Sequence, residues 1–182
     1  MTSSAKNIVL IGFMGTGKSR VGKTLAKKLG RPLVDVDQRI EQGEKRRVAQ
    51  IFEKEGEIYF RRLEKEAIRD VSAGRGLVIT TGGGAVIDPE NVSALKANGI
   101  LVLLEATPQT IYQRVKDSRH RPLLKSGDVQ GEIGRLLEAR RSYYDQADLR
   151  CTTDGKTAQQ VADEILRALE NEEEFEFGKD WF

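Results

Sequence analysis

The stretch Asn7-Ile-Val-Leu-Ile-Gly-Phe-Met-Gly-Thr-Gly-Lys-Ser19 decides the fold of this chain. It opens with an apolar, β-rich run at residues 7–11, and the segment that follows it, 18–29, places Val21, Leu25 and Leu29 on one helical face. Residues 12–19 fit the pattern Gly-x-x-x-x-Gly-Lys-Ser, whose backbone N–H groups surround phosphate oxygens. A buried strand before the loop and a helix after it are the context that the pattern requires. The sequence therefore predicts a nucleotide site at the end of the first strand.

Within this loop each residue type has a chemical reason to be present. Glycines let the chain turn tightly, and the start of the helix adds positive potential. Lys18 is placed for the β- and γ-phosphates, and the Ser19 hydroxyl for a magnesium ion. We expect the nucleotide, ATP with Mg²⁺, to contact residues Gly15, Thr16, Gly17, Lys18, Ser19 and Arg20.

Length, charge and cysteine content limit the class of protein. The 182 residues, 38% of them hydrophobic, suffice for one domain with a buried core. Thirty basic and 28 acidic residues leave a net charge of +2, so we expect neither a nucleic-acid nor a membrane partner. The single Cys151 excludes an intrachain disulfide and fits a reducing compartment, and we expect it to be buried packing. No run approaches the ~20 apolar residues that span a bilayer. We expect a monomer of the cytoplasm.

Apolar runs alternate with amphipathic segments along the whole chain. Further strands are predicted at 32–36, 77–80, 100–104 and 149–153, and helices at 57–71, 89–97, 108–115, 132–144 and 158–169. Asp88-Pro89 and Thr107-Pro108 are typical helix starts, with a capping side chain before proline. This alternation predicts a three-layer α/β/α fold around a five-stranded parallel sheet.

The predicted domain covers residues 1–169. It contains a helical insertion at about 38–71 and a long loop, a lid, at about 116–125. Residues 170–182 mix glutamates with aromatic residues, and we expect a disordered tail whose aromatic side chains could dock on a partner or on the domain.

Two acidic residues, Asp35 and Asp37, stand at the carboxyl end of the second predicted strand. Ligands of open α/β sheets bind beyond these strand ends, so both carboxylates should lie near the phosphate loop. Strand alternation predicts that they share a side, one serving magnesium and the other the acceptor hydroxyl. The alternative for Asp37 is that it only caps the next helix.

Three consecutive glycines, Gly82, Gly83 and Gly84, follow the third predicted strand. They would let a ligand approach the backbone closely and would offer it N–H donors. The alternative is a tight turn with a purely structural role.

Several nucleotide-binding classes are disfavoured by missing motifs. No Asn-Lys-x-Asp segment is present to read guanine, and the chain is shorter than a transporter ATPase domain. A short chain with a lid is typical of a small-molecule kinase, although phosphate binding alone does not prove one.

With these three sites in this order, the sequence resembles the shikimate kinases, a P-loop, nucleoside-monophosphate-kinase-like family, over about residues 7–169. Further matching motifs are Ile40-Glu41, Ile51-Phe52, Gly56-Glu57…Phe60-Arg61…Glu64, Arg121-Pro122-Leu123-Leu124 and Arg140…Tyr144…Ala147-Asp148. The resemblance implies a P-loop kinase fold with a lid. It also implies ATP-dependent phosphorylation of the shikimate 3-hydroxyl, an alcohol acceptor, giving shikimate 3-phosphate in chorismate and aromatic amino-acid biosynthesis.

The same resemblance implies roles for single residues. Asp37 would bind the shikimate hydroxyls and accept the proton, and Asp35 would hold magnesium through water. Arg61, Arg140 and the 82–84 backbone would grip shikimate, since a guanidinium suits bidentate capture of a carboxylate. On the nucleotide, Arg121 would be the lid arginine at the phosphates, Arg114 would lie over adenine, and Lys156 would add a further contact.

The chain departs from the family pattern at a few positions. Lys45 and Arg47 stand where the family has glycine and serine, and Ser142 replaces a frequent proline. Because Arg141 is adjacent, the choice of Arg140 depends on its spacing to Tyr144. His120, between arginines of the lid, is expected to be an exposed loop residue.

Two other functions remain as alternatives. One is a kinase of another polyol acid such as gluconate, against which the Asp-x-Asp and Gly-Glu-x-x-Phe-Arg motifs argue. The other is a nucleotide-binding regulatory module without catalysis, against which intact Lys18, Ser19, Asp37 and Arg121 argue.

Overall fold

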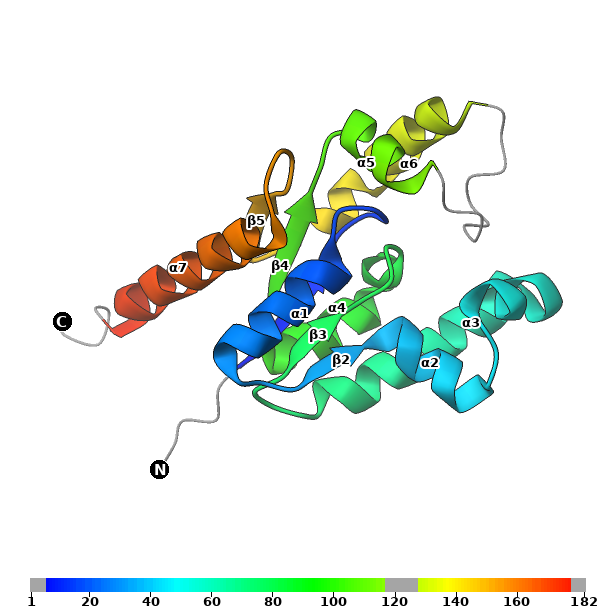
Figure 1. Cartoon of the computed structure of the whole chain (residues 1–182). Helices are drawn as coiled ribbons and strands as arrows, with labels where there is room; N and C mark the ends of the chain where they lie inside the picture. Colours follow the sequence, from blue (N-terminus) through cyan, green and yellow to red (C-terminus); the bar gives the residue numbers. More distant parts are fainter. Residues whose placement is uncertain (1–5, 117–127, 178–182) are drawn as a thin grey trace.

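A five-stranded parallel sheet forms the centre of the molecule (Figure 1). The computed structural model describes residues 6–116 and 128–177, with side chains described as far as residue 171. The strand order is β2-β3-β1-β4-β5, and every pairing is parallel. The strands are β1 (Asn7–Ile11), β2 (Leu33–Asp35), β3 (Val78–Thr80), β4 (Gly99–Glu105) and β5 (Leu149–Thr152). The predicted sheet is confirmed, and no strand boundary differs from the prediction by more than one residue.

Helices cover both faces of this sheet, which confirms the three-layer architecture. They are α1 (Lys18–Leu29), α2 (Val36–Glu44), α3 (Val48–Ser72), α4 (Pro89–Ala97), α5 (Pro108–Val115), α6 (Val129–Tyr144) and α7 (Ala158–Phe177), with a short 3₁₀ turn η1 (Ala85–Ile87). Helices α1 and α7 share one hydrophobic cluster with the sheet, whereas α3, α4, α5 and α6 contribute to the cluster on its other face.

Strand β1 is apolar at successive positions because both of its faces are buried. Its alternate residues Ile8 and Leu10 belong to one cluster, and Val9 and Ile11 to the other. All four are at most 3% exposed, so neither face of this strand can carry a polar side chain without cost. Strand β1 lies between β3 and β4, where the strand order reverses, and ligands of open α/β sheets bind at this point.

The predicted helix starts at residues 88 and 107 are also present. Asp88 Oδ1 accepts a hydrogen bond from Glu90 N at 2.8 Å, and Thr107 Oγ1 accepts one from Thr110 N at 3.3 Å. Each satisfies an N–H group that the first helical turn leaves without a partner.

The insertion after β2 differs from the prediction in two ways. Strand β2 ends at Asp35 and α2 begins at Val36, so Asp37 lies in a helical turn and the strand-alternation argument for it was wrong. The segment α3 also contains a helical stretch before Gly56 that was not predicted, from Val48 onward. Gly56, at φ 82° and ψ 175°, is not helical and separates it from a second stretch, which begins where the helix over 57–71 was predicted.

The C-terminal segment is also helical further than expected. Helix α7 continues to Phe177, beyond its predicted end at residue 169, and the disorder expected for residues 170–182 stays a prediction. The segment is rich in glutamate, a strong helix former, and contains no glycine or proline before Gly178. Within the described part of the chain, no helix combines the length and apolar character needed to cross a membrane.

Candidate active site

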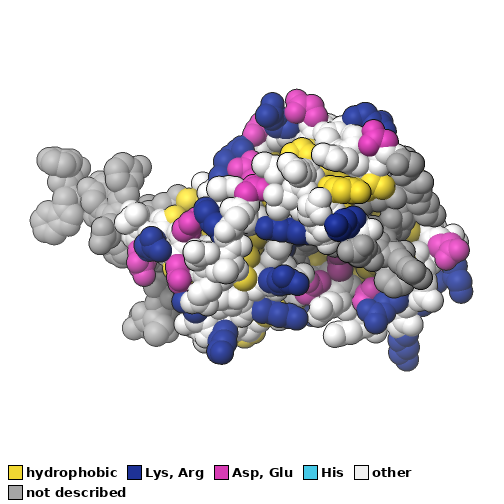
Figure 2. Space-filling view, turned by 45° about the horizontal axis from the view of Figure 1, so that its top comes forward, with side chains coloured by type: hydrophobic (Ala, Val, Ile, Leu, Met, Phe, Trp, Pro, Cys, Tyr) yellow, Lys and Arg dark blue, Asp and Glu magenta, His cyan; other side chains and the backbone are white. Residues whose placement is uncertain are grey.

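One cavity of about 1140 Å³ opens beyond the carboxyl ends of β1, β2 and β3. Figure 2 shows Lys and Arg side chains gathered on the face of the molecule on this side. Every predicted site residue that the structure describes lines it: Gly15, Thr16, Gly17, Lys18, Ser19, Arg20, Asp35, Asp37, Arg61, Gly82, Gly83, Gly84, Arg114, Arg140 and Lys156. Arg121 and the lid around it lie outside the described residues.

The phosphate loop has the backbone angles that only glycine adopts readily. Gly12, Gly15 and Gly17 have φ values of 134°, 78° and 101°, and a β-carbon on Gly12 would lie 2.3 Å from Leu104 O. Lys18 Nζ donates to Gly12 O at 2.6 Å and to the carbonyl of residue 13 at 2.9 Å, which holds its ammonium group across the loop. Among the described residues no side chain caps the start of α1, whose dipole adds positive potential at the loop.

Asp35 connects the sheet to the helix that follows it. Its Oδ1 accepts from Gln38 N at 3.0 Å, which makes it the N-cap of α2, and its Oδ2 accepts from Thr80 Oγ1 at 2.8 Å. The cap is therefore Asp35, and the capping role considered for Asp37 is wrong. Both oxygens already have one protein partner, which leaves their other lone pairs for water or a cation.

The surroundings of Asp37 disfavour the ionised form of its carboxyl group. Its Oδ1 is shielded from solvent and has no hydrogen-bond partner. Burial, then the charges of Asp35 and Glu64, raise the pKa of Asp37 to about 6, although the Lys18 ammonium opposes the shift. A carboxylate with a raised pKa and an unoccupied acceptor atom is suited to receive a proton.

The glycines at 82–84 lie close to side chains of other segments. None of them has a positive φ, so no special turn geometry demands glycine there. A β-carbon on Gly82 would lie 3.0 Å from Glu64 Oε1 and 3.1 Å from Asp37 Oδ1, and one on Gly84 would lie 2.5 Å from Arg61 Nη2. The missing side chains let two carboxylates and a guanidinium approach this backbone.

Glu64 is a buried carboxylate to which the sequence argument gave no role. Its Oε2 accepts from Arg61 Nη1 at 2.7 Å, and Glu57 Oε1 accepts from the other side of the same guanidinium at 3.0 Å. Burial raises the pKa of Glu64 despite the opposing charge of Arg61. The i,i+3 spacing of Arg61 and Glu64 was the available signal.

Arg140, on α6, is 8% exposed and lies beside the glycine segment. Its guanidinium carbon is 5.4 Å from the centre of the Phe13 ring, a cation–π contact. Nearby, the Tyr144 hydroxyl donates to Gly83 O at 2.7 Å, and burial raises the pKa of Tyr144 to about 12. Arg141 is 74% exposed and pairs with a glutamate on its own helix, so Arg140 is the arginine of the cavity.

The far end of the cavity is formed by α5 and the turn after β5. Arg114 donates hydrogen bonds to residues of the phosphate loop and of this turn. Lys156 Nζ pairs with Glu164 Oε2 at 2.7 Å, and Cys151 Sγ lies 3.3 Å from the same oxygen. Cys151 is buried, as predicted, and burial raises the pKa of its thiol to about 11.

The metal donors in the cavity suit a hard cation. Among the residues that the structure describes, no group of three His, Cys, Asp or Glu is arranged as a metal site. Ser19 and Asp35 both line the cavity with oxygen atoms. Mg²⁺ is usually held by one or two such ligands together with water and substrate phosphates, so the donor set fits it.

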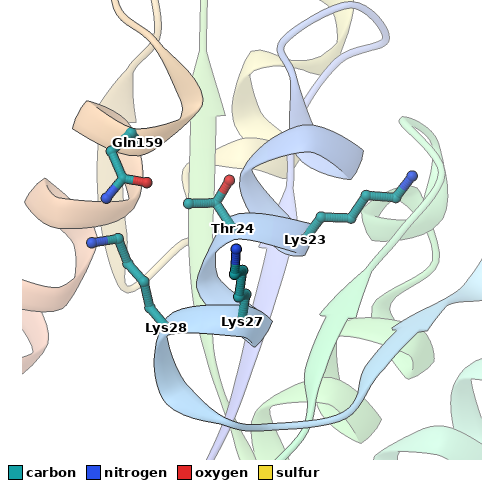
Figure 3. Close-up of a pocket in the computed structure, with 5 residues that line it drawn as sticks. All are labelled: Lys23, Thr24, Lys27, Lys28 and Gln159. Atoms are coloured by element: carbon teal, nitrogen blue, oxygen red, sulfur yellow. The ribbon is translucent and has the colours of Figure 1, made fainter.

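A second, shallower hollow lies between α1 and α7 (Figure 3). It is lined by Lys23, Thr24, Lys27, Lys28 and Gln159, and its lysine side chains point in different directions. Lys28 is already paired with Asp163 at 2.7 Å. We regard it as a solvated helix surface.

Known proteins resemble the chain over nearly its whole length. The family model for shikimate kinase matches residues 14–170. A shikimate kinase of Persephonella marina is 46% identical over 161 residues, covering 88% of this chain and 97% of that one. The structure of a shikimate kinase from Acinetobacter baumannii in complex with shikimate has a TM-score of 0.89 at 35% identity, covering 93% and 95% of the two chains.

A more distant similarity separates fold from family. A gluconokinase from Sinorhizobium meliloti has a TM-score of 0.64 but only 17% identity, covering 97% of this chain and 98% of that one, and so shares the fold alone. This chain belongs to the shikimate kinase family.

Proposed function

We propose that this member of the shikimate kinase family transfers the γ-phosphoryl group of ATP to the 3-hydroxyl of shikimate, giving ADP and shikimate 3-phosphate. One observation carries the proposal: a single cavity brings the phosphate loop together with two arginines and with Asp37, whose Oδ1 is shielded from solvent and has no hydrogen-bond partner among the described residues. The phosphate loop binds the phosphoryl donor, and the carboxylate with the two arginines binds an acceptor that carries both hydroxyl groups and a carboxylate.

The nucleotide half of the cavity consists of residues 12–20, Asp35, Arg114 and the turn at 153–157. The loop N–H groups and Lys18 hold the β- and γ-phosphates, and Arg20 lies beside them. The Ser19 hydroxyl and Asp35 would hold Mg²⁺, which would neutralise charge on the phosphates. Arg114 and Lys156 lie on the side of the base.

The acceptor half consists of Asp37, Arg61, Glu64, residues 82–84 and Arg140. The two guanidinium groups provide planar donors for the shikimate carboxylate, and Glu64 and Glu57 fix the orientation of Arg61. The glycine segment leaves space for the ring and offers backbone donors. Asp37 accepts from the acceptor hydroxyls.

The reaction requires positioning, charge stabilisation and a proton acceptor. Asp37 accepts the hydroxyl proton while that oxygen bonds to the γ-phosphorus and the bond to the ADP oxygen breaks. With a pKa of about 6, Asp37 is mainly ionised at neutral pH and still basic enough to take the proton. Lys18 stabilises the charge that develops, together with Arg121 from the lid.

We also infer a cytoplasmic monomer without nucleic-acid or membrane partners. Residues of one chain form the whole described cavity, the net charge is +2, and a single buried thiol suits a reducing compartment.

The test is an ADP-release assay with shikimate, with gluconate and with no acceptor, followed by ³¹P NMR of the product. We expect release that depends on shikimate and a phosphomonoester on its 3-oxygen. Release with gluconate alone would favour the polyol-acid kinase. Nucleotide binding without any transfer would favour the regulatory module, and equal release without acceptor would contradict a kinase.

A further inference from the structure

The guanidinium group of Arg114 connects two loops of the nucleotide half. Its Nη1 donates to Gly15 O at 3.1 Å and to Thr153 Oγ1 at 2.9 Å, and its Nη2 donates to Thr153 O at 2.9 Å. Gly15 belongs to the phosphate loop, whereas Thr153 begins the turn after β5. These contacts hold the two loops together before any nucleotide is present.

Helix α5, which carries Arg114, also packs directly against the phosphate loop. A β-carbon on Gly15 would lie 2.8 Å from Val115 Cγ1 and 3.4 Å from Ile111 Cγ2, and both of these side chains are buried. At the other end of α5, the Thr107 N–H and hydroxyl donate to Asp154, the residue after Thr153. Hydrogen bonds therefore join both ends of α5 to the 153–154 turn. The last turn of α5 packs against Gly15.

The orientation of the Gly15 carbonyl matters for phosphate binding. In a trans peptide the C=O and the following N–H point in opposite directions. With the Gly15 carbonyl turned toward Arg114, the Thr16 N–H points into the loop, where its contact with the carbonyl of residue 13 is long, 3.4 Å. Fixing the carbonyl thus fixes the direction of an N–H group within the phosphate cradle.

We propose that Arg114 is a positioning residue for the phosphate loop, acting through Gly15 and Thr153 and independently of the base. The proposal deepens the proposed ATP site and goes beyond the contact with adenine that the family resemblance implies. Its consequence is that loss of the guanidinium weakens the binding of a triphosphate that has no base.

The test is calorimetric titration of the full chain with MgATP and with magnesium tripolyphosphate. Arg114→Met keeps the aliphatic stem and removes the donors. We expect the affinities for both ligands to fall by the same factor, about tenfold, as for loss of a charge-assisted hydrogen-bond set. A weaker ATP affinity with unchanged tripolyphosphate affinity would show a contact with the base only and overturn the proposal.

Thr153 variants separate positioning from a direct contact of Arg114 with phosphate. Thr153→Val leaves the guanidinium but removes its hydroxyl acceptor, together with the hydrogen bond that this hydroxyl donates to Glu105 O at 3.1 Å. We expect a two- to threefold loss of tripolyphosphate affinity, roughly one weak hydrogen bond. Thr153→Ser should restore the affinity, and the Arg114→Met/Thr153→Val double variant should bind no more weakly than Arg114→Met. Wild-type affinity in Thr153→Val, or fully additive losses, would overturn the proposal.

Two controls keep the result interpretable. Ser93→Ala, on the exposed face of α4 and outside the cavity, should bind tripolyphosphate like the wild type. Thermal unfolding identifies any variant that fails to fold, in which case Thr153→Ala replaces Thr153→Val. If the wild type binds tripolyphosphate but phosphorylates no shikimate, the proposed function fails while Arg114 is still tested.

Discussion

Glycines in the nucleotide half have positive φ, and Gly12 also lacks space for a β-carbon, whereas glycines in the acceptor half have ordinary backbone angles and lie against the ends of side chains. Gly12, Gly15 and Gly17 have positive φ, and Gly82 and Gly84 do not. The phosphate loop is one continuous segment, so its geometry is largely local. The acceptor half is assembled from four separate segments, and its properties depend on which charges burial brings together. A local motif tolerates few changes, and an assembled site can be altered one contact at a time.

The largest effect is expected in the nucleotide half. Lys18→Met removes the cation that lies across the phosphate loop, and among the described residues no other lysine is held on the loop carbonyls. We expect transfer to fall by about a thousandfold or more, the scale for loss of a transition-state charge partner. Steady-state turnover measures this, and shikimate binding by titration should remain near the wild-type value. A variant that kept most of its turnover would contradict the loop assignment.

Asp37→Asn should have the largest effect in the acceptor half, and it should act on activity and stability in opposite directions. Turnover should fall by roughly a hundred- to ten-thousandfold because the proton acceptor is lost, with little change in ATP affinity. Near-normal turnover would remove Asp37 from the chemistry.

The stability effect of Asp37→Asn depends on pH. The pKa of Asp37 is raised from 3.8 to about 6 on folding, so the folded state binds more protons than the unfolded state between these values. Its contribution therefore becomes destabilising as the pH rises from about 4 to 6, and the penalty is complete above 6. We expect the asparagine variant to be more stable at pH 7.5, by on the order of 2 kcal/mol, and the difference to vanish near pH 4. Denaturant unfolding at both values measures it, and a pH-independent difference would exclude this origin.

Adjacent arginines provide a matched pair for the acceptor half. Arg140→Lys replaces a buried planar guanidinium group by a compact ammonium group. We expect KM for shikimate to rise about tenfold while KM for ATP is unchanged. Arg141→Lys alters only an exposed side chain and should leave both constants as they are. Equal effects of the two substitutions would show that Arg140 is not the specific contact.

The smallest effect is expected away from both halves, at Lys45. Lys45, at the end of α2, is the one non-glycine residue of the described chain with a positive φ, 53°. Lys45→Gly should raise stability by about 0.5 kcal/mol, since the relief of left-handed strain exceeds the entropy cost of glycine. Unfolding experiments measure the shift, and Lys45→Ala, which keeps the β-carbon, should not reproduce it. Activity should be unchanged.

Residues at strand ends were predictable because parallel strands all point their carboxyl ends at one edge. The sequence alone therefore predicts that Asp35, Asp37 and Gly82 lie near the phosphate loop, and all three line the same cavity as the loop. The local geometry was less predictable. Strand β2 ends at Asp35, which caps helix α2, and Asp37 lies in the first turn of that helix. Helix boundaries of this kind depend on which side chain reaches an unpaired N–H, and several acidic residues nearby could do so.

The sequence by itself determined the phosphate loop, the parallel α/β fold and the family, because a continuous motif and a periodic pattern carry them. Only the tertiary structure decided that Arg140 rather than Arg141 enters the cavity, that Glu64 is buried against Arg61, and that Arg114 joins Gly15 to Thr153. These outcomes depend on contacts between segments far apart in the chain. Burial then sets the charge state of Asp37, since desolvation acts on groups only after folding has removed their water.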